Sequence, residues 1–252
     1  MKGVHSAASA GFTAWVDAYV AGRPGYPPQI ETWLRETLRL EPQSLAVEVG
    51  AGSGKFTALL AGTGARVIAV EPVAAMRERL ARDLPEVDAR DGYAEALPLA
   101  SESADALVCA QAFHWFATSA AVVEMRRVLK PGGVLGLVWN VRDEAVPWVA
   151  ALTRVIAPYE GDTPRFAGGE WRHVFPAPGF GPLVEHTFAH AHVGPASQVV
   201  VARLLSTSFI AALDADTRAD IAAQARGVLT AHGVGETVAF PYVTRAYACE
   251  RR

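Results

Sequence analysis

The feature that most restricts the fold is a regular alternation of apolar runs and amphipathic segments between about residues 30 and 140. Short apolar runs predict buried strands at 45–49, 66–70, 86–89, 104–110 and 134–139. Apolar residues at helical spacing predict helices at 30–40, 56–61, 73–84 and 118–129. Strands that alternate with helices form a parallel sheet with helices on both faces. Ligands of such sheets bind beyond the carboxyl ends of the strands, where the strand order reverses, so the residues after each strand are informative.

Beyond Trp139 the alternation is looser. We expect helices at 145–156, 197–205 and 214–231, and strands at 183–192 and 238–249. The stretch 157–182 is rich in Pro, Gly and aromatic residues, which predicts a loop or cap.

Composition narrows the function classes. With 252 residues, of which 51% are hydrophobic, the chain can bury a sizeable core. A net charge of −3, with acids and bases interspersed, provides no positive field for a nucleic-acid backbone. Cys109 and Cys249 are too few for a disulfide framework or a zinc site, which is typical of a reducing compartment. With no leader pattern and no apolar stretch of spanning length, we expect a cytoplasmic protein without a membrane or nucleic-acid partner.

The first predicted strand leads into a glycine-rich stretch, VEVGAGSGKFTAL at residues 47–59. A phosphate-binding P-loop needs a glycine five positions before its Gly-Lys pair and Ser or Thr directly after the pair. Here Val49 stands at the first of these positions and Phe56 at the second, so both requirements fail. A dinucleotide fingerprint that began at Gly50 would need a third glycine at position 55, which is Lys55.

Two acidic residues at strand ends point to a different ligand. Glu48 ends the first strand, where it would repel a pyrophosphate and attract a cation or an ammonium group. Glu71 follows the second strand, 21 residues after Gly50, where a carboxylate can accept both hydroxyls of a ribose. The glycines let the backbone turn sharply and approach a ligand closely. Together these residues predict a nucleoside that carries positive charge.

With these residues the chain resembles the class I S-adenosylmethionine-dependent methyltransferases. Four segments carry the resemblance, in family order at the strand ends: EVGAGSG at 48–54, VEP at 70–72, DGYAEALP at 91–98 and RVLKPGG at 127–133. Three more are similar to the trans-aconitate methyltransferase group: YVAGRPGYP at 19–27, QAFHW at 111–115 and AFP at 239–241. Glu48 stands where aspartate is commoner in the family, as a longer acid in the same role.

The resemblance implies an α/β fold with a doubly wound, mostly parallel, seven-stranded Rossmann-like methyltransferase sheet. It implies an N-terminal lid at residues 1–30 and an S-adenosylmethionine-binding core at 31–140. Residues 141–252 would form a C-terminal helical cap with the substrate region, and would add the closing strands of the sheet. The implied activity moves a methyl group from S-adenosylmethionine, leaving S-adenosylhomocysteine, to a small molecule, with an oxygen of a small acidic metabolite favoured. Methylation of nitrogen or carbon stays open, as does a non-catalytic S-adenosylmethionine-binding regulatory module.

The resemblance also implies the residues of the cofactor site. They are Tyr19, Arg23, Glu48, Gly50, Ala51, Gly52, Glu71, Pro72, Ala94, Glu95 and Gln111. Glu71 would bind the ribose hydroxyls, and Ala94 and Glu95 would meet the adenine. Tyr19 and Arg23 would reach the methionine carboxylate from the lid, a task that suits a permanently charged guanidinium. Each role has a plain alternative. Glu71 could be a solvated acid at a strand end, Glu95 an acid that starts a helix, and Arg23 an arginine in an ordinary turn.

The implied residues on the acceptor side are Tyr26, His114, Trp115 and Trp139. His114 is the evident candidate for a catalytic base; it is otherwise a substrate ligand or a packing residue beside Trp115. Methyl transfer from a sulfonium is an in-line displacement that depends mainly on proximity and alignment. A carboxylate acceptor is already ionised at neutral pH and needs no base, whereas a phenol or an alcohol would benefit from one.

Motifs of nucleic-acid methylation are missing from the acceptor side. Gln111 does not begin the Asn/Asp-Pro-Pro-aromatic pattern of amino methylation on bases. Cys109 does not follow a proline, as the nucleophile of base carbon methylation does. We therefore expect a small-molecule acceptor; no feature of the sequence sets an oligomeric state.

Two further groups lie in the C-terminal part of the chain. His186, His190 and His192 share one side of the predicted strand 183–192. No acid or cysteine with ligand spacing completes a metal site with them, so we expect none. Cap residues that could select the acceptor, or be ordinary loop residues, are Arg165, Trp171, Arg172 and His173.

Overall fold

The computed structural model describes residues 23–252. The chain divides into two compact units, and each is described by itself. The core unit comprises residues 26–139, 164–188 and 244–252; the second unit comprises the described residues up to 25, with 140–163 and 189–243.

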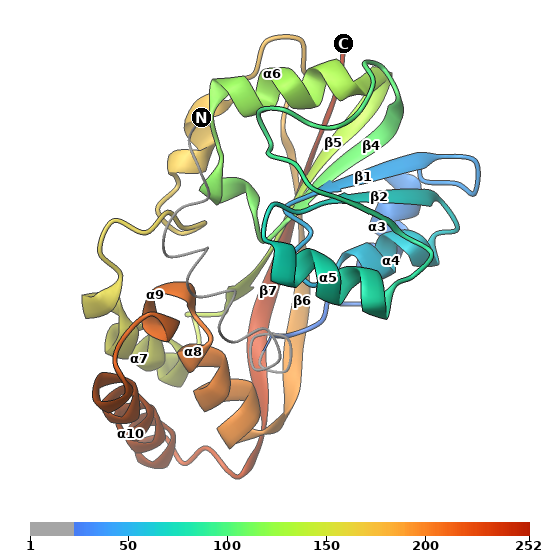
Figure 1. Cartoon of the computed structure of the whole chain (residues 1–252). Coiled ribbons are helices and arrows are strands. Elements are labelled where there is room, and N and C mark those ends of the chain that lie inside the picture. Colours follow the sequence, from blue (N-terminus) through green and yellow to red (C-terminus); the bar gives the residue numbers. More distant parts are fainter. Residues whose placement is uncertain (1–22) are drawn as a thin grey trace. The chain divides into compact units, whose positions relative to one another are not determined.

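In the described chain, seven strands form one sheet in the order β3-β2-β1-β4-β5-β7-β6. They are β1 Leu45–Val49, β2 Arg66–Val70, β3 Asp88–Arg90, β4 Ala104–Ala110, β5 Leu129–Arg142, β6 Val184–Pro195 and β7 Thr237–Glu250. Parallel pairs join β1 to β2 and β4, β2 to β3, and β4 to β5 (Figure 1). The strand order reverses between β1 and β4, where sheets of this type bind ligands. The doubly wound, mostly parallel, seven-stranded sheet expected from the sequence is confirmed.

Helices occur where the apolar spacing predicts them, and one short helix, at 208–211, lies outside the predicted segments. They are α3 Gln29–Glu36, α4 Thr57–Gly62, α5 Ala74–Asp83, α6 Ser119–Val128, α7 Pro147–Ile156, α8 Arg203–Leu205, α9 Ser208–Ala211 and α10 Ala215–Ala231. Short 3₁₀ turns are η1 Phe113–Trp115, η2 Ala157–Tyr159 and η3 Glu170–Val174, and a π-helical segment, η4 Ser197–Ala202, leads into α8.

The Lys-Pro-Gly-Gly segment at 130–133 closely follows α6. It is an irregular part of β5, because Ala104 of β4 pairs with Leu129 whereas Ala106 already pairs with Val134. The extra residues bulge out of the ladder. Their backbone is bonded to the end of the chain: the Gly132 N–H donates to the Arg251 carbonyl at 2.9 Å. Local sequence pattern alone cannot predict a partner this distant along the chain.

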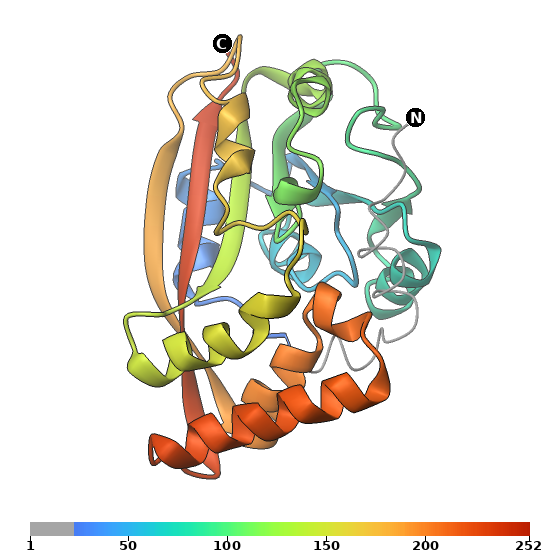
Figure 2. The same cartoon turned by 90° about the vertical axis from the view of Figure 1, so that its left-hand side faces the viewer.

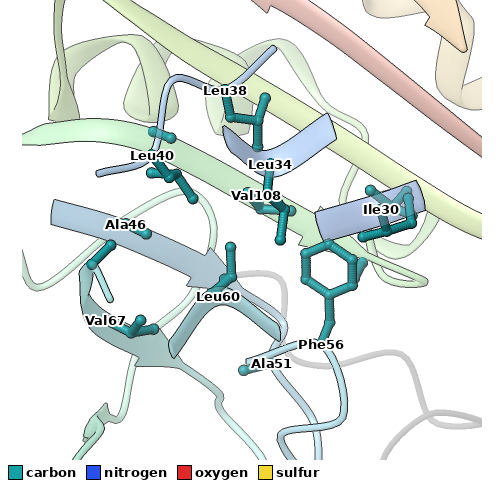
Figure 3. Packing of buried hydrophobic residues seen from close by; sticks show 14 of the residues in the cluster. Ile30, Leu34, Leu38, Leu40, Ala46, Ala51, Phe56, Leu60, Val67 and Val108 are labelled. Carbon is teal, nitrogen blue, oxygen red and sulfur yellow. The ribbon is translucent and has the colours of Figure 1, made fainter. Parts of the chain in front are cut away.

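In the core unit, α3, α4 and α5 cover one face of the sheet. Ile30 and Leu34 of α3 and Leu60 of α4 pack with Ala46 and Val108 of the strands (Figure 3). Successive strand side chains point to opposite faces, so their neighbours along the strands face the other side, where they are also buried. Burial on both faces is why the strands are continuous apolar runs in the sequence.

The second unit has its own apolar cluster. Val149 and Leu152 of α7 pack with Ile221 and Leu229 of α10, and Figure 2 shows these two helices side by side. Asp214 caps α10, since its carboxylate accepts the Thr217 N–H at 2.8 Å.

No helix in the described part of the chain combines the length and the apolar composition that a membrane span requires.

Candidate functional site

The glycine loop after β1 has two glycines with different surroundings. Gly50 and Gly52 have φ values of +72° and +56°, in the left-handed region that favours glycine. A Cβ on Gly50 would lie 2.7 Å from the Cβ of Ala112, so the segment after β4 packs directly on this loop. A Cβ on Gly52 would meet no atom within 4 Å. The loop therefore leaves open space at Gly52 that a ligand can fill.

Glu71, at the end of β2, is bonded to this loop. Its Oε2 accepts the Gly52 N–H at 2.8 Å, and its Oε1 accepts the Val73 N–H at 2.9 Å. Burial raises the pKa of the carboxyl, and these two bonds oppose the rise without cancelling it. Each oxygen keeps a further acceptor site beyond these bonds. Glu71 can therefore accept two ribose hydroxyls, the role expected from the sequence, and the open space at Gly52 leaves room beside the loop for part of a nucleoside cofactor.

Glu48, at the end of β1, is in a different state from the one expected. It is 1% exposed, and the Thr57 hydroxyl donates to its Oε2 at 2.5 Å. Burial raises the pKa of Glu48 to about 8, against the effect of the Thr57 bond. The carboxyl is therefore neutral near pH 7 and must lose its proton before it can attract an ammonium group. Thr57 is not among the predicted site residues; its signal in the sequence is a hydroxyl residue where a helix follows the glycine loop.

The segment at 91–98 lies beside the end of β2. A Cβ on Gly92 would lie 2.9 Å from Cγ1 of Val70. The Ala96 N–H donates to the Tyr93 carbonyl at 3.0 Å, which closes a turn around Ala94 and Glu95. In this turn Ala94 is buried and Glu95 is exposed. Pro72, which follows Glu71, is half-buried.

Gln111 turns the chain at the end of β4. Its φ is +59°, which is uncommon for a residue with a side chain and is typical of functional segments. Its N–H donates to the Val138 carbonyl at 2.8 Å. The turn leads directly into η1, which carries His114 and Trp115, and Ala112 beside it packs on the glycine loop. The structure therefore brings together the loop, Glu71 and the acceptor-side segment.

His114 is hydrogen-bonded to Trp139, which lies on β5 and is 1% exposed. The Trp139 indole Nε1 donates to His114 Nδ1 at 3.0 Å. Because an indole N–H can only donate, Nδ1 carries a lone pair, and the proton of the neutral ring is on Nε2. The ring also lies 5.1 Å from the Trp115 ring. His114 therefore presents a hydrogen-bond donor at Nε2 in its neutral form.

Two of the cap residues belong to an aromatic cluster of the core unit. Trp171 is 1% exposed, and its ring lies 4.7 Å from that of Trp139. The Arg172 guanidinium lies 4.5 Å from the Trp171 ring centroid and donates to the Tyr247 hydroxyl at 2.8 Å. Trp171 and Arg172 therefore serve packing here, while His173 is exposed and Arg165 is half-buried.

The remaining predicted residues all precede α3 in the sequence. Tyr26 packs edge-on against Phe56, with ring centroids 4.9 Å apart, just after the glycine loop. Arg23 belongs to the second unit, where it donates to the Ser206 carbonyl at 3.4 Å. Tyr19 lies outside the described residues.

The three histidines of β6 occupy alternate, half-buried positions on one side of the strand. Burial lowers the pKa of His190. Within residues 23–252, no group of three or more His, Cys, Asp and Glu side chains could hold a metal ion.

Comparisons with known proteins agree with this geometry. The methyltransferase domain family matches residues 47–137. An uncharacterized methyltransferase-like protein of Schizosaccharomyces pombe is 43% identical over 173 residues, 68% of each chain. An uncharacterized methyltransferase of Mycobacterium tuberculosis is 43% identical over 157 residues, 62% of this chain and 63% of that protein. The structure of a candidate type II methyltransferase from Anaeromyxobacter dehalogenans is similar with a TM-score of 0.64 and 27% identity, over 90% of this chain and 96% of that one. The chain belongs to the class I S-adenosylmethionine-dependent methyltransferases.

Proposed function

We propose that this methyltransferase acts on a carboxylate oxygen of a small acidic metabolite, as the trans-aconitate methyltransferases do that its sequence resembles. The cofactor, when bound, supplies a methyl group on a positively charged sulfur. The acceptor oxygen forms a bond to that methyl carbon as the carbon–sulfur bond breaks, which leaves S-adenosylhomocysteine and a methyl ester. Such a displacement needs alignment of the two partners more than proton transfer.

The state of His114 is the observation that supports a carboxylate. Trp139 occupies its Nδ1, and its proton is on Nε2, so the neutral ring donates at Nε2 and has no lone pair there to take a proton. A phenol or an alcohol would benefit from a base, whereas a carboxylate is ionised at neutral pH. An anionic oxygen is also the better acceptor for an N–H donor. In this proposal His114 holds the acceptor, and Trp139 keeps its ring in the donating form.

The cofactor residues form part of the same proposal. Glu71 would bind the ribose hydroxyls, and the two acceptor positions left on its oxygens support this role. The residues that we propose to contact the rest of the cofactor are Tyr19, Arg23, Glu48, Gly50, Ala51, Gly52, Pro72, Ala94, Glu95 and Gln111. Tyr26, Trp115 and Trp139 would line the acceptor side with His114. We propose that residues 1–30 form the lid, that residues 31–140 form the cofactor-binding core, and that residues 141–252 form the cap with the substrate region.

Replacing His114 separates a donor from a base. His114→Gln keeps an N–H donor but cannot act as a base, so kcat/KM should fall by no more than about tenfold, the net worth of one hydrogen bond. His114→Leu, with neither property, should lose more. Loss of a general base would instead lower kcat by roughly 10²–10⁴-fold in both variants.

The pH profile gives a second readout. With S-adenosylmethionine saturating, so that ionisation of Glu48 before cofactor binding does not enter, wild-type kcat/KM for a carboxylic acid should stay flat from about pH 6 to 8. A base with the ordinary histidine pKa of about 6.5 would make it fall tenfold per unit below that value. Equal, large losses in both variants together with such a fall would refute the donor role.

Trp139→Phe should lower kcat/KM by a few-fold, because it frees the proton of His114 to occupy either nitrogen.

A further inference from the structure

We propose that Glu124 and Arg127 of α6 are positioning residues that hold segment 91–98 in the shape that binds the adenine of the cofactor. The inference rests on the proposed contact of Ala94 and Glu95 with adenine. Neither Glu124 nor Arg127 is among the residues expected to touch the cofactor.

Both backbone groups of Leu97 are bonded to these two side chains. The Leu97 N–H donates to Glu124 Oε1 at 2.7 Å, and the Leu97 carbonyl accepts from Arg127 Nη2 at 3.4 Å. Glu124 and Arg127 lie three positions apart on α6 and bond each other twice, through Nε–Oε2 and Nη2–Oε1, both at 2.7 Å. Such a bidentate guanidinium–carboxylate pair has a defined geometry, so the two side chains fix the position of the Leu97 backbone.

Arg127 also bonds residues that follow Leu97, in the connection that runs from Asp91 to Ser103. Its Nη2 donates to the Leu99 carbonyl at 2.9 Å, and its Nη1 donates to the Ser101 hydroxyl at 3.1 Å. The Glu124 side chain is 15% exposed, so the pair is shielded from solvent more than a surface ion pair. The bond from Arg127 lowers the pKa of Glu124, which therefore stays charged throughout the neutral range.

The connection from Asp91 to Ser103 depends on such anchors, because it contains no helix or strand. At its start, Arg77 Nη1 bonds Asp91 at 3.2 Å through a side chain that is 67% exposed, which is a weak anchor. In its middle, Arg90 Nη1 donates to the Pro98 carbonyl at 2.8 Å from a side chain that is 35% exposed. The Glu124–Arg127 pair, whose carboxylate is 15% exposed, bonds three residues of the connection: Leu97, Leu99 and Ser101. Without the pair, only a fraction of molecules would hold the segment in the binding shape. The apparent Kd rises by the inverse of that fraction.

Glu124→Gln and Arg127→Lys test the proposal. Both carboxylate oxygens of Glu124 accept hydrogen bonds, so the amide of Glu124→Gln must turn its NH₂ group toward one of the donors. In Arg127→Lys, the single ammonium group cannot form the two parallel bonds of the guanidinium. We expect the calorimetric Kd for S-adenosylhomocysteine to rise about tenfold, as for a tenth of molecules in the binding shape. KM for S-adenosylmethionine should rise equally, with kcat within about twofold. Amide hydrogen exchange of residues 93–98 should quicken in the cofactor-free variants.

Glu102→Gln is the matched control. Glu102 lies on the same connection and pairs with Arg251 at 2.7 Å, but it does not bond residues 91–98. This variant should leave Kd and the exchange of residues 93–98 unchanged. A lower melting temperature with unchanged Kd, or a fall in kcat with unchanged KM, would overturn the positioning role. Failure of the wild type to bind S-adenosylhomocysteine would instead refute the cofactor site. Hydrogen exchange of residues 93–98 would then still test whether Glu124 and Arg127 hold this segment.

Discussion

Replacing Glu48 by glutamine should remove a large part of the pH dependence of stability in the cofactor-free protein. Burial raises the pKa of Glu48 from 4.5 to about 8 in the folded chain. Between these values the folded state holds one proton more than the unfolded state does. The contribution of Glu48 to stability is therefore complete below about pH 4.5 and is lost as the pH rises through about 8.

The size of the effect follows from the same shift. Each pH unit inside this window lowers the free energy of unfolding by ~1.4 kcal/mol. From about pH 6 to 8 the loss is roughly 2–3 kcal/mol, which for a chain of this length lowers the melting temperature by about 5–10 °C. The variant loses this slope, because glutamine does not titrate and can still accept the Thr57 hydroxyl. Glu71, whose pKa is also raised by burial, adds a slope of the same sign that remains in the variant.

Thermal unfolding without cofactor at about pH 6, 7 and 8 measures both slopes. Glu78→Gln, a change at an exposed glutamate of α5, is the control and should keep the wild-type slope. Equal slopes for the wild type and Glu48→Gln would refute the reasoning, because Glu48 would then be ionised in the folded protein despite its burial.

Three further predictions concern the cofactor loop and the aromatic cluster. Glu71→Gln should weaken calorimetric binding of S-adenosylhomocysteine by about tenfold or more, since charge-assisted bonds to the ribose are lost; unchanged affinity would remove Glu71 from the site. Gly50→Ala should lower the melting temperature more than Gly52→Ala, because its Cβ would meet Ala112 at 2.7 Å whereas that of Gly52 meets nothing; Gly52→Ala should chiefly weaken binding, and the reverse order would contradict the loop geometry. Trp171→Ala should cost about 3–5 kcal/mol of unfolding free energy in chemical denaturation, because the ring is buried; a loss below about 1 kcal/mol would mean that the cluster is not a packed core.

Most of the fold could be predicted from the sequence because the sheet is covered on both faces. Runs such as Leu45–Val49 and Arg66–Val70 are continuous apolar strands only in that setting, and both strands begin and end where expected. The position of Glu71 also follows from local pattern, since a residue directly after a strand lies at the ligand edge of a parallel sheet.

The features that escaped prediction depend on contacts between distant residues. The pKa of Glu48 is raised because the fold buries its carboxyl, and the sequence shows only an acid at a strand end. The tautomer of His114, which lies on η1, is set by Trp139, 25 positions away on β5. Glu124 and Arg127 have a spacing typical of a surface ion pair on a helix, and only the fold brings Leu97 to them.

The chemical stability of the methylated product distinguishes a carboxylate oxygen from every other acceptor atom considered above. Wild-type protein would be incubated with S-adenosylmethionine labelled in its methyl group and with a series of small di- and tricarboxylic acids, and the products would then be treated with alkali. A methyl ester releases labelled methanol under these conditions, whereas methyl groups on nitrogen, carbon or an ether oxygen stay in place. We expect labelled methanol in proportion to the S-adenosylhomocysteine formed. Label that remains in an alkali-stable product would contradict carboxylate methylation.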